Sequence, residues 1–431
     1  MGLIIGDHEH LQSLEHYCRD EQLHKLKINA DRLWATLAET ASFGGTLQEG
    51  VRRLALSIED QHVRDWLVSS CKEVGCSVSV DEVGNMFALR PGSDTGALPI
   101  AVGSHLDTQP TGGRFDGILG VLSGLEIMRT LHDYDYKTRS PLMLVNWTNE
   151  EGARFAPAML GSGVHAGVFD REFAYSREDA DGIRFSDALE ASGYRGSLPV
   201  GEQKFAAMFE VHIEQGPVLE REDFDIGIVT GVQAMRWYDL TITGCEAHAG
   251  TTPMNMRSDA LMGAAHILIE TERLAKDMGG LATIGQLSIP ASSRNVVAGN
   301  VVMSIDLRHE RDDVLEEMES KLRAILMSIC GPDRARLVSI WESPAVRFDD
   351  GCLGAIRSGA YDANAHAREI VSGAGHDSVN ISKIAPTAMI FIPCRDGLSH
   401  NPLEYASKDH CALGTQTLLN AVLSYDLMLY N

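Results

Sequence analysis

Between residues 76 and 170, short apolar runs typical of β-strands alternate with a longer segment whose apolar residues recur at helical spacing. Strands are expected at 77–80, 86–89, 98–102 and 141–147, and a helix is expected at 117–131. This alternation predicts an α/β domain with a central mixed sheet flanked by helices. Ligands of such domains bind at the carboxyl ends of the strands. Polar residues that directly follow these runs are therefore the candidates for a functional site.

A different order of elements begins between residues 225 and 240. We expect strands at 239–243, 283–288, 300–307 and 335–340, and helices at 258–278 and 313–329. Their order along the chain is strand, helix, strand, strand, helix and strand, which is the ferredoxin-like order. We therefore expect an inserted domain at 227–341, within a catalytic domain formed by 28–226 and 342–431. The remaining elements of the catalytic domain are expected at 28–73, where the pattern is helical, and at 354–364, 386–391 and 412–429. Residues 1–27 are expected to form an N-terminal extension.

Charge and hydropathy exclude several classes of function. The chain carries 37 Lys and Arg residues against 60 Asp and Glu residues, a net charge of −23. Such a surface repels nucleic-acid backbones and anionic membranes, so neither partner is expected. There is no apolar run of about 18 residues, and the first apolar run ends at Asp7, so neither a transmembrane helix nor a signal peptide is expected. The eight cysteines are scattered without a Cys-x-x-Cys pair, which favours reduced thiols and a cytoplasmic protein.

Two polar segments surround the helix expected at 117–131. His105 and Asp107 follow the strand expected at 98–102. This is the arrangement of a metal-ligating histidine whose far ring N–H is held by a carboxylate, although a surface histidine beside a turn aspartate is the more common explanation of such a pair. Asp116 precedes the helix, where an ordinary N-cap is the alternative to a metal ligand. Taken singly, neither segment decides between these alternatives.

The remaining candidates come from three further segments. Glu150 and Glu151 follow the strand expected at 141–147, and adjacent side chains there point in opposite directions. One carboxylate can therefore bind a metal while the other accepts a proton from water. His212 and His400 each lie at or just beyond an apolar run. Together the set predicts a hydrolase with a nitrogen and oxygen metal site, whose ligands are His105, Asp116, Glu151, His212 and His400.

Seven segments then identify a family. In chain order they are Gly-Ser-His-Leu-Asp-Thr, Gly-Gly-Arg-Phe-Asp-Gly, Asn-Glu-Glu-Gly-Ala-Arg-Phe, His-Ile-Glu-Gln-Gly-Pro, Ala-His-Ala-Gly-Thr-Thr-Pro-Met, Gly-Ala-Gly-His-Asp and Ser-His-Asn-Pro. Over about residues 28–429 the chain resembles the hydantoinase/carbamoylase-type amidases, relatives of dinuclear-zinc aminopeptidases. The family includes N-carbamoyl-L-amino-acid hydrolases, β-ureidopropionases and allantoate amidohydrolases. His212 favours the amidase branch, because related metallopeptidases usually carry an aspartate there.

The resemblance implies a zinc aminopeptidase-like catalytic domain with two divalent ions per subunit. Zinc is the first choice, with manganese, cobalt or nickel as alternatives. Asp116 would bridge the ions, with His105 and His400 on one and Glu151 and His212 on the other. Glu150 would be the general base, and Asp107 would orient His105.

The inserted domain resembles the family's lid and dimerisation domain, which implies a homodimer. His248 is similar to the histidine that reaches the site of the partner subunit to stabilise the oxyanion, and whether it acts in cis or in trans stays open. Asn295 and Arg308 match contacts of the substrate carboxylate, for which a bidentate arginine is suited. Gln215 matches a polar substrate contact.

The implied activity is hydrolysis of the ureido C–N bond of N-carbamoyl-L-amino acids or N-carbamoyl-β-amino acids, giving the amino acid, carbon dioxide and ammonia. The substrate is then a small carbamoyl or ureido carboxylate. An allantoate amidohydrolase and, less favoured, a dinuclear aminopeptidase or dipeptidase remain as alternatives. A non-catalytic scaffold is disfavoured because Glu150 and the full ligand set are present.

Overall fold

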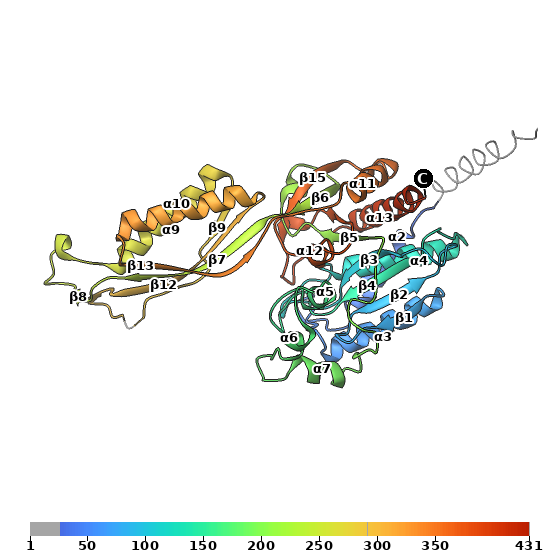
Figure 1. The fold of residues 1–431 in the computed structure, drawn as a ribbon, viewed down its shortest axis with the longest axis horizontal. Helices are drawn as coiled ribbons and strands as arrows, with labels where there is room; N and C mark the ends of the chain where they lie inside the picture. Colours follow the sequence, from blue (N-terminus) through green and yellow to red (C-terminus); the bar gives the residue numbers. More distant parts are fainter. Residues whose placement is uncertain (1–25, 291, 431) are drawn as a thin grey trace, which may run out of the picture. The chain divides into compact units, whose positions relative to one another are not determined.

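The structure is a computed structural model that describes residues 26–290 and 292–430 (Figure 1). These residues form two compact units: the first ends at Thr230 and resumes at Phe348, and the second is Gly231–Arg347. Nearly all of the N-terminal extension expected at 1–27 lies outside the described residues.

The first unit is built on a mixed sheet. The strands of this sheet are β1 (Ser77–Val80), β2 (Met86–Arg90), β3 (Ile100–His105), β4 (Leu142–Trp147), β5 (Ala207–Ile213), β6 (Ile226–Val232), β14 (Val346–Arg347), β15 (Ala367–Ser372) and β16 (Thr387–Ile392). β14 and the last two residues of β6 fall within the range of the second unit. Their order is β1-β2-β4-β3-β5-β16-β6-β14, with β15 also beside β6. The central strands β4, β3, β5 and β16 are parallel, whereas β1, β2 and β6 pair antiparallel. The predicted α/β class with a central mixed sheet is confirmed.

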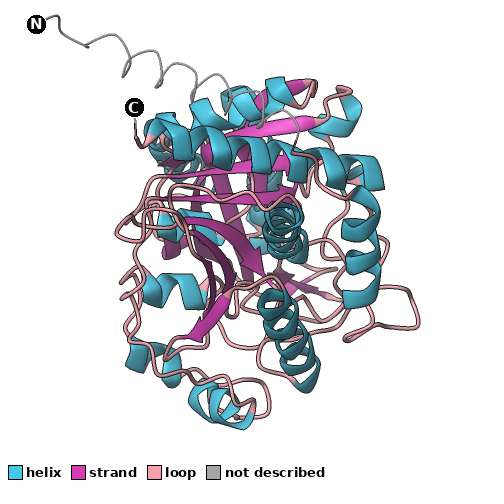
Figure 2. Ribbon diagram, turned by 90° about the vertical axis from the view of Figure 1, so that its right-hand side faces the viewer, coloured by secondary structure: helices cyan, strands magenta, loops and turns pink. Residues whose placement is uncertain are grey.

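Helices surround this sheet (Figure 2). They are α2 (Ala30–Thr40), α3 (Ile58–Glu73), α4 (Ile118–Asp133), α5 (Leu160–His165), α6 (Arg171–Tyr175), α7 (Phe185–Ala191), α8 (Val218–Arg221), α11 (Asp350–Asp362), α12 (Asp377–Ile381) and α13 (Lys408–Met428), with a 3₁₀ turn η2 (Arg395–Gly397). Side chains of Asn29, Ser57 and Ser407 accept backbone N–H groups and so begin α2, α3 and α13. Among the described residues, no helix combines the length and apolar character needed to cross a bilayer.

The helical pattern expected over residues 28–73 is wrong in its middle. Residues 41–57 are irregular, and Val51 forms bridges to Gly45 and Gly112 instead of a helical turn. Val51 and Leu56 are buried. Their apolar character therefore reflects the packing of this irregular segment against the core. Val51, Leu54 and Leu56, which are three and two positions apart, therefore imitate a helical pattern without forming a helix.

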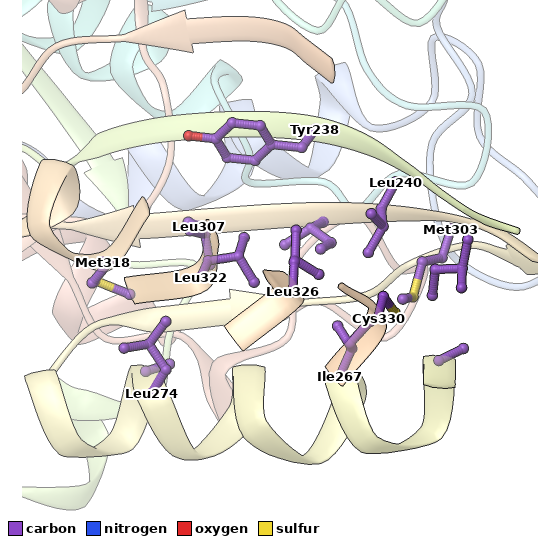
Figure 3. Packing of buried hydrophobic residues seen from close by; sticks show 14 of the residues in the cluster. Tyr238, Leu240, Ile267, Leu274, Met303, Leu307, Met318, Leu322, Leu326 and Cys330 are labelled. Carbon is purple, nitrogen blue, oxygen red and sulfur yellow. The ribbon is translucent and has the colours of Figure 1, made fainter. Parts of the chain in front are cut away.

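The second unit has its own sheet and core. Its elements are β7 (Ala234–Thr243), β8 (Ala247–His248), η1 (Met254–Met256), α9 (Ala260–Met278), β9 (Leu281–Thr283), β10 (Leu287–Ser288), β11 (Val296–Val297), β12 (Asn300–His309), α10 (Asp312–Cys330) and β13 (Ala335–Ser343). The main sheet runs β10-β12-β7-β13, with β9 beside β12. Alternate residues of β12 are buried against α9 and α10, and Leu307, Leu322 and Ile267 illustrate this core (Figure 3). The strand expected at 283–288 is two short strands instead.

The cysteines of the described residues are all free thiols. Six of them are buried, and Cys245 is exposed. The expectation of reduced thiols therefore holds for this part of the chain, while Cys18 lies outside the described residues.

Candidate metal centre

Candidate residues collect at one edge of the first unit's sheet. His105 ends β3, His212 lies near the end of β5, and Glu150 and Glu151 follow β4. Because β3 pairs parallel with both β4 and β5, the carboxyl ends of these strands share one edge. Asp116 joins them from the loop before α4.

The two oxygens of Asp116 face two different groups of side chains. Oδ1 lies 3.1 Å from His212 Nε2 and 3.7 Å from His105 Nε2. Oδ2 lies 3.5 Å from His400 Nε2, which in turn is 3.3 Å from Glu151 Oε2. Both groups have donor atoms within 4.8 Å of one another, the spacing of a possible metal site. One carboxylate is therefore common to two potential ligand sets.

This grouping differs from the pairing that the family resemblance implies. His105 lies with His212, and Glu151 lies with His400. The orientation of Asp116 underlies this grouping, because its Oδ1 faces His105 and His212 whereas its Oδ2 faces His400. His400 comes instead from the loop after β16 and reaches the Glu151 side of Asp116.

The histidine rings are oriented by backbone carbonyls. Nδ1 of His105 lies 2.9 Å from the carbonyl oxygen of Asp107, and Nδ1 of His212 lies 2.9 Å from that of Ile213. A carbonyl can only accept, so each Nδ1 carries a hydrogen and each Nε2 presents a lone pair or a second proton to Asp116. Metal-ligating histidines are held by the same carbonyl contact. A cation between Nε2 and Asp116 would satisfy both groups.

The role expected for Asp107 is wrong in one respect. Its carboxylate is 3.9 Å from His105 Nδ1, beyond hydrogen-bond distance, because its carbonyl takes that place. The carboxylate instead accepts the backbone N–H groups of Glu150 and Glu151, each at 3.2 Å. Burial raises the pKa of Asp107 to about 6. Asp107 therefore holds both the His105 ring and the turn that carries the two glutamates.

Asp116 does not act as a helix cap. The N-cap of α4 is Gly117, which has no side-chain capping bond. The carboxylate of Asp116 instead accepts hydrogen bonds at Oδ2 from Gln215 Nε2 at 2.8 Å and from Ser399 Oγ at 2.7 Å. Gly117 also makes room for the histidine, because a Cβ there would lie 2.2 Å from His105 Cε1.

Charge in the cluster favours a cation. Burial raises the pKa of Asp116, but the hydrogen bond and charge of His212, with His105 and His400, outweigh burial and hold it below its usual range. Burial lowers the pKa of His212, but Asp116 outweighs it and raises the pKa to about 9. The hydrogen bond with Glu151 raises the pKa of His400 to about 9. Divalent ions held by neutral histidines would supply the same positive charge, and the nitrogen and oxygen donor set fits zinc or manganese.

Glu150 lies beside the two groups without belonging to either. It is 7% exposed, and its Oε2 lies 3.5 Å from His105 Nε2. Burial, followed by the charges of Asp377 and Glu151, raises its pKa well above the ordinary value. A buried carboxyl group with a raised pKa next to potential ligands is suited to accept and return a proton.

Gln215 also lies against the cluster. Its backbone has φ +58°, which turns the side chain so that Nε2 contacts Asp116 and Ser399. Its Oε1 is buried and has no hydrogen-bond partner. An unpaired buried acceptor is costly unless a ligand donates to it. Gln215 Oε1 can therefore still accept a hydrogen bond from a ligand, as a polar substrate contact would.

The other predicted substrate contacts belong to the second unit. His248 is exposed on β8, opposite Val296 of β11, and the neighbouring Ala249 N–H donates to the carbonyl of Asn295. The structure thus brings His248 and Asn295 close together. Arg308 lies near the end of β12 and is bound through Nε and Nη2 to Asp306 of the same strand. The roles of these residues stay predictions.

Several buried polar residues around the cluster were not predicted. His376 packs against His212 with ring centroids 4.6 Å apart, and Glu210 accepts the hydroxyl of Ser104 at 2.6 Å. Glu404 contacts the loop that carries Asp116. The Gly-Ala-Gly-His-Asp segment contained a signal for His376, but nothing in the sequence spacing identifies Glu210 or Glu404.

Comparison with known proteins places this geometry in context. The sequence model of peptidase family M20/M25/M40 matches residues 101–424. The chain is 45% identical over 403 residues to an N-carbamoyl-L-amino-acid amidohydrolase of Rhizobium meliloti, covering 92% of this chain and 96% of that protein. It is 32% identical over 386 residues to an allantoate amidohydrolase of Bacillus subtilis, covering 88% and 93%. A solved amidase of the hydantoinase/carbamoylase family from Burkholderia multivorans superposes with a TM-score of 0.90 at 46% identity, covering 93% and 98%.

Proposed function

The chain belongs to peptidase family M20/M25/M40 and to its hydantoinase/carbamoylase-type amidases, and from this premise we propose that it hydrolyses the ureido C–N bond of N-carbamoyl-L-amino acids. The products are the amino acid, carbon dioxide and ammonia. The observation that carries the proposal is Asp116, whose two oxygens face two ligand groups beside the buried Glu150. The 45% identity to an N-carbamoyl-L-amino-acid amidohydrolase supports this substrate class.

Two divalent ions, zinc as the first choice, would be held by these groups. One would be bound by His105 and His212, the other by Glu151 and His400, and Asp116 would be common to both. Ions held there would supply a lowered pKa to a water molecule and polarisation to the ureido carbonyl.

Glu150 moves the proton. Its carboxylate accepts a proton from the water as the water oxygen attacks the ureido carbon, and it then delivers that proton to the nitrogen of the departing amino acid. The bond between this nitrogen and the carbonyl carbon breaks, and the carbamate that remains decomposes to carbon dioxide and ammonia. Gln215, whose Nε2 donates to Asp116, would accept an N–H of the ureido group at its unpaired Oε1.

For the second unit, we retain the roles that the resemblance implies. His248 would donate to the developing oxyanion, and Asn295 and Arg308 would bind the substrate carboxylate. The unit would act as a lid and as the interface of a homodimer, and the enzyme would work in the cytoplasm.

Allantoate is the second candidate substrate, because it is also a ureido carboxylate and because the chain is 32% identical to an allantoate amidohydrolase over most of both lengths. A substrate panel decides between them. Metal-free protein is reconstituted with Zn²⁺, Mn²⁺ or Co²⁺ and assayed on N-carbamoyl-L-amino acids, N-carbamoyl-β-alanine, allantoate and unmodified dipeptides. The highest kcat/KM is expected for an N-carbamoyl-L-amino acid. A higher value for allantoate would transfer the assignment, and faster cleavage of dipeptides would contradict the amidase proposal.

A further inference from the structure

Glu404 is a buried carboxylate attached to the loop that carries Asp116. It is 3% exposed. Its Oε1 accepts two consecutive backbone N–H groups, from Phe115 at 2.9 Å and from Asp116 at 3.0 Å. Burying a carboxylate is unfavourable unless it is well hydrogen-bonded, and here the donors belong to the residue shared by the two ligand groups and to its neighbour.

A second contact runs through a hydroxyl. Ser399 Oγ lies 2.7 Å from Asp116 Oδ2 and 3.2 Å from Glu404 Oε2. A hydroxyl has one hydrogen to donate, and the shorter distance assigns it to Asp116. Glu404 thus accepts the backbone N–H of Asp116. Its other oxygen faces Ser399, which in turn donates to the Asp116 side chain.

The chain is shaped to admit this carboxylate. A Cβ at Gly113 would lie 2.2 Å from Glu404 Cδ, so any larger residue there would displace Glu404. Glu404 also follows His400 by four positions, in a turn closed by its own N–H to the carbonyl of Asn401. The loops that carry Asp116 and His400 are irregular. The hydrogen bonds of Glu404, which lies in the His400 loop, connect this loop directly to the Asp116 loop.

We infer that Glu404 is a positioning residue that fixes Asp116 so that its two oxygens face the His105–His212 group and the Glu151–His400 group. The inference rests on the proposed metal centre. Glu404 touches neither group of donors itself and acts through the backbone N–H groups of Phe115 and Asp116, while Ser399 lies between its carboxylate and the Asp116 side chain. Loss of a residue that orients a metal ligand typically weakens metal binding by about 10- to 100-fold.

The chain offers a matched control. Asp426 is 4% exposed and likewise accepts two consecutive backbone N–H groups, from Arg139 at 2.8 Å and Ser140 at 2.7 Å. These donors carry no candidate ligand. Glu404→Ala and Asp426→Ala therefore remove the same kind of interaction, but only the first removes it from the proposed centre.

The experiment measures Zn²⁺ affinity of the metal-free full chain by competition with a chromogenic chelator, together with the thermal midpoint. Glu404→Ala should weaken at least one Zn²⁺ site by about 10-fold or more, whereas Asp426→Ala should keep wild-type affinity despite a lowered midpoint. Glu404→Gln keeps an acceptor for both N–H groups, and its amide can donate to Ser399, so it should restore most of the affinity.

Ser399→Ala provides an independent variant should Glu404→Ala fail to fold, and it should also weaken Zn²⁺ binding. Unchanged affinity in Ser399→Ala and in every folded Glu404 variant would overturn the inference, as would equal losses in Glu404→Gln and Glu404→Ala. Equal losses in Glu404→Ala and Asp426→Ala would also overturn it, because the effect would then be general destabilisation. If the wild type itself binds no Zn²⁺, the proposed centre is wrong and the inference falls with it, whereas tight wild-type binding with unaffected variants rejects the inference alone.

Discussion

His165 should make the first unit sensitive to acid, in a way that a single substitution can remove. The ring is 5% exposed and stacks on Phe205 at 5.5 Å, with Trp147 at 5.1 Å and Phe87 at 5.7 Å. Burial lowers its pKa to about 4, against an ordinary value of 6.5, and the backbone of Gln203 offsets burial only in part. A protonated imidazole is therefore poorly accommodated in this aromatic cluster.

The sign and size of the change in the free energy of unfolding follow from proton linkage. The folded-state pKa of His165 is depressed, so its contribution to stability is complete above pH 6.5 and is lost as pH falls toward about 4. Each pH unit within this window costs about 1.4 kcal/mol. Between pH 7.5 and pH 5.0, the free energy of unfolding should therefore fall by about 2 kcal/mol on account of His165 alone.

The assay compares wild type with His165→Phe, which keeps an aromatic ring in the cluster. Urea unfolding of metal-free protein is followed by tryptophan fluorescence at several pH values, so that loss of metal at low pH does not contribute. The variant should lack the 2 kcal/mol decrease, whereas His266→Gln, which removes an exposed imidazole on α9, controls for loss of a histidine. Parallel pH profiles for wild type and His165→Phe would refute the argument.

Three further predictions concern the proposed centre. Glu150→Gln should lower kcat by about 10²- to 10⁴-fold while zinc content stays near two per chain; substantial residual turnover would exclude Glu150 as the base. Dialysis against a chelator should abolish hydrolysis and lower the thermal midpoint, and Zn²⁺, Mn²⁺ or Co²⁺ should restore both; full activity of the metal-free protein would contradict a metal-dependent mechanism. Gly117→Ala and Gly167→Ala both place a Cβ at positive φ, +67° and +73°; Gly167→Ala should lose about 1 kcal/mol of stability, and Gly117→Ala should lose more because its Cβ also meets the His105 ring. Only the first Cβ would meet a side chain, the His105 ring, so only Gly117→Ala should lose zinc affinity, and equal affinities would show that the ring can move aside.

Long periodic segments were the easiest parts of the fold to predict. The helices expected at 258–278 and 313–329 are α9 (Ala260–Met278) and α10 (Asp312–Cys330). Their apolar stripes persist over several turns, so chance spacing cannot imitate them. The apolar residues at 51, 54 and 56 cover only about one turn and a half of a helix, and they belong to an irregular buried segment. Short patterns report burial, and burial alone does not specify a helix.

Details of the site depended on contacts that residue types do not encode. His105 and Asp107 are close together, as their spacing suggests, but the main-chain carbonyl of Asp107 holds the ring and its carboxylate holds the glutamate turn. A sequence motif identifies which residues are near one another without distinguishing main-chain from side-chain contacts. The role of Glu404 could not be predicted for a related reason: the backbone N–H groups that it accepts lie in a loop nearly 290 residues earlier in the chain.

The pairing of the candidate ligands depends on how the side chain of Asp116 is oriented, which explains why it could not be predicted from the sequence. In sequence, His105 is followed by Asp116, Glu151, His212 and His400. Any division into pairs of the four candidate ligands other than Asp116 is equally consistent with that order. Strand order does not decide the pairing either, because β3 lies between β4 and β5 and pairs with both. Asp116 belongs to no strand and enters between the two groups from the loop held by Glu404. Two ligand groups with one shared carboxylate therefore arise where β3, β4 and β5 end at one edge of the sheet, and where a single anchored loop turns one oxygen of Asp116 toward each group.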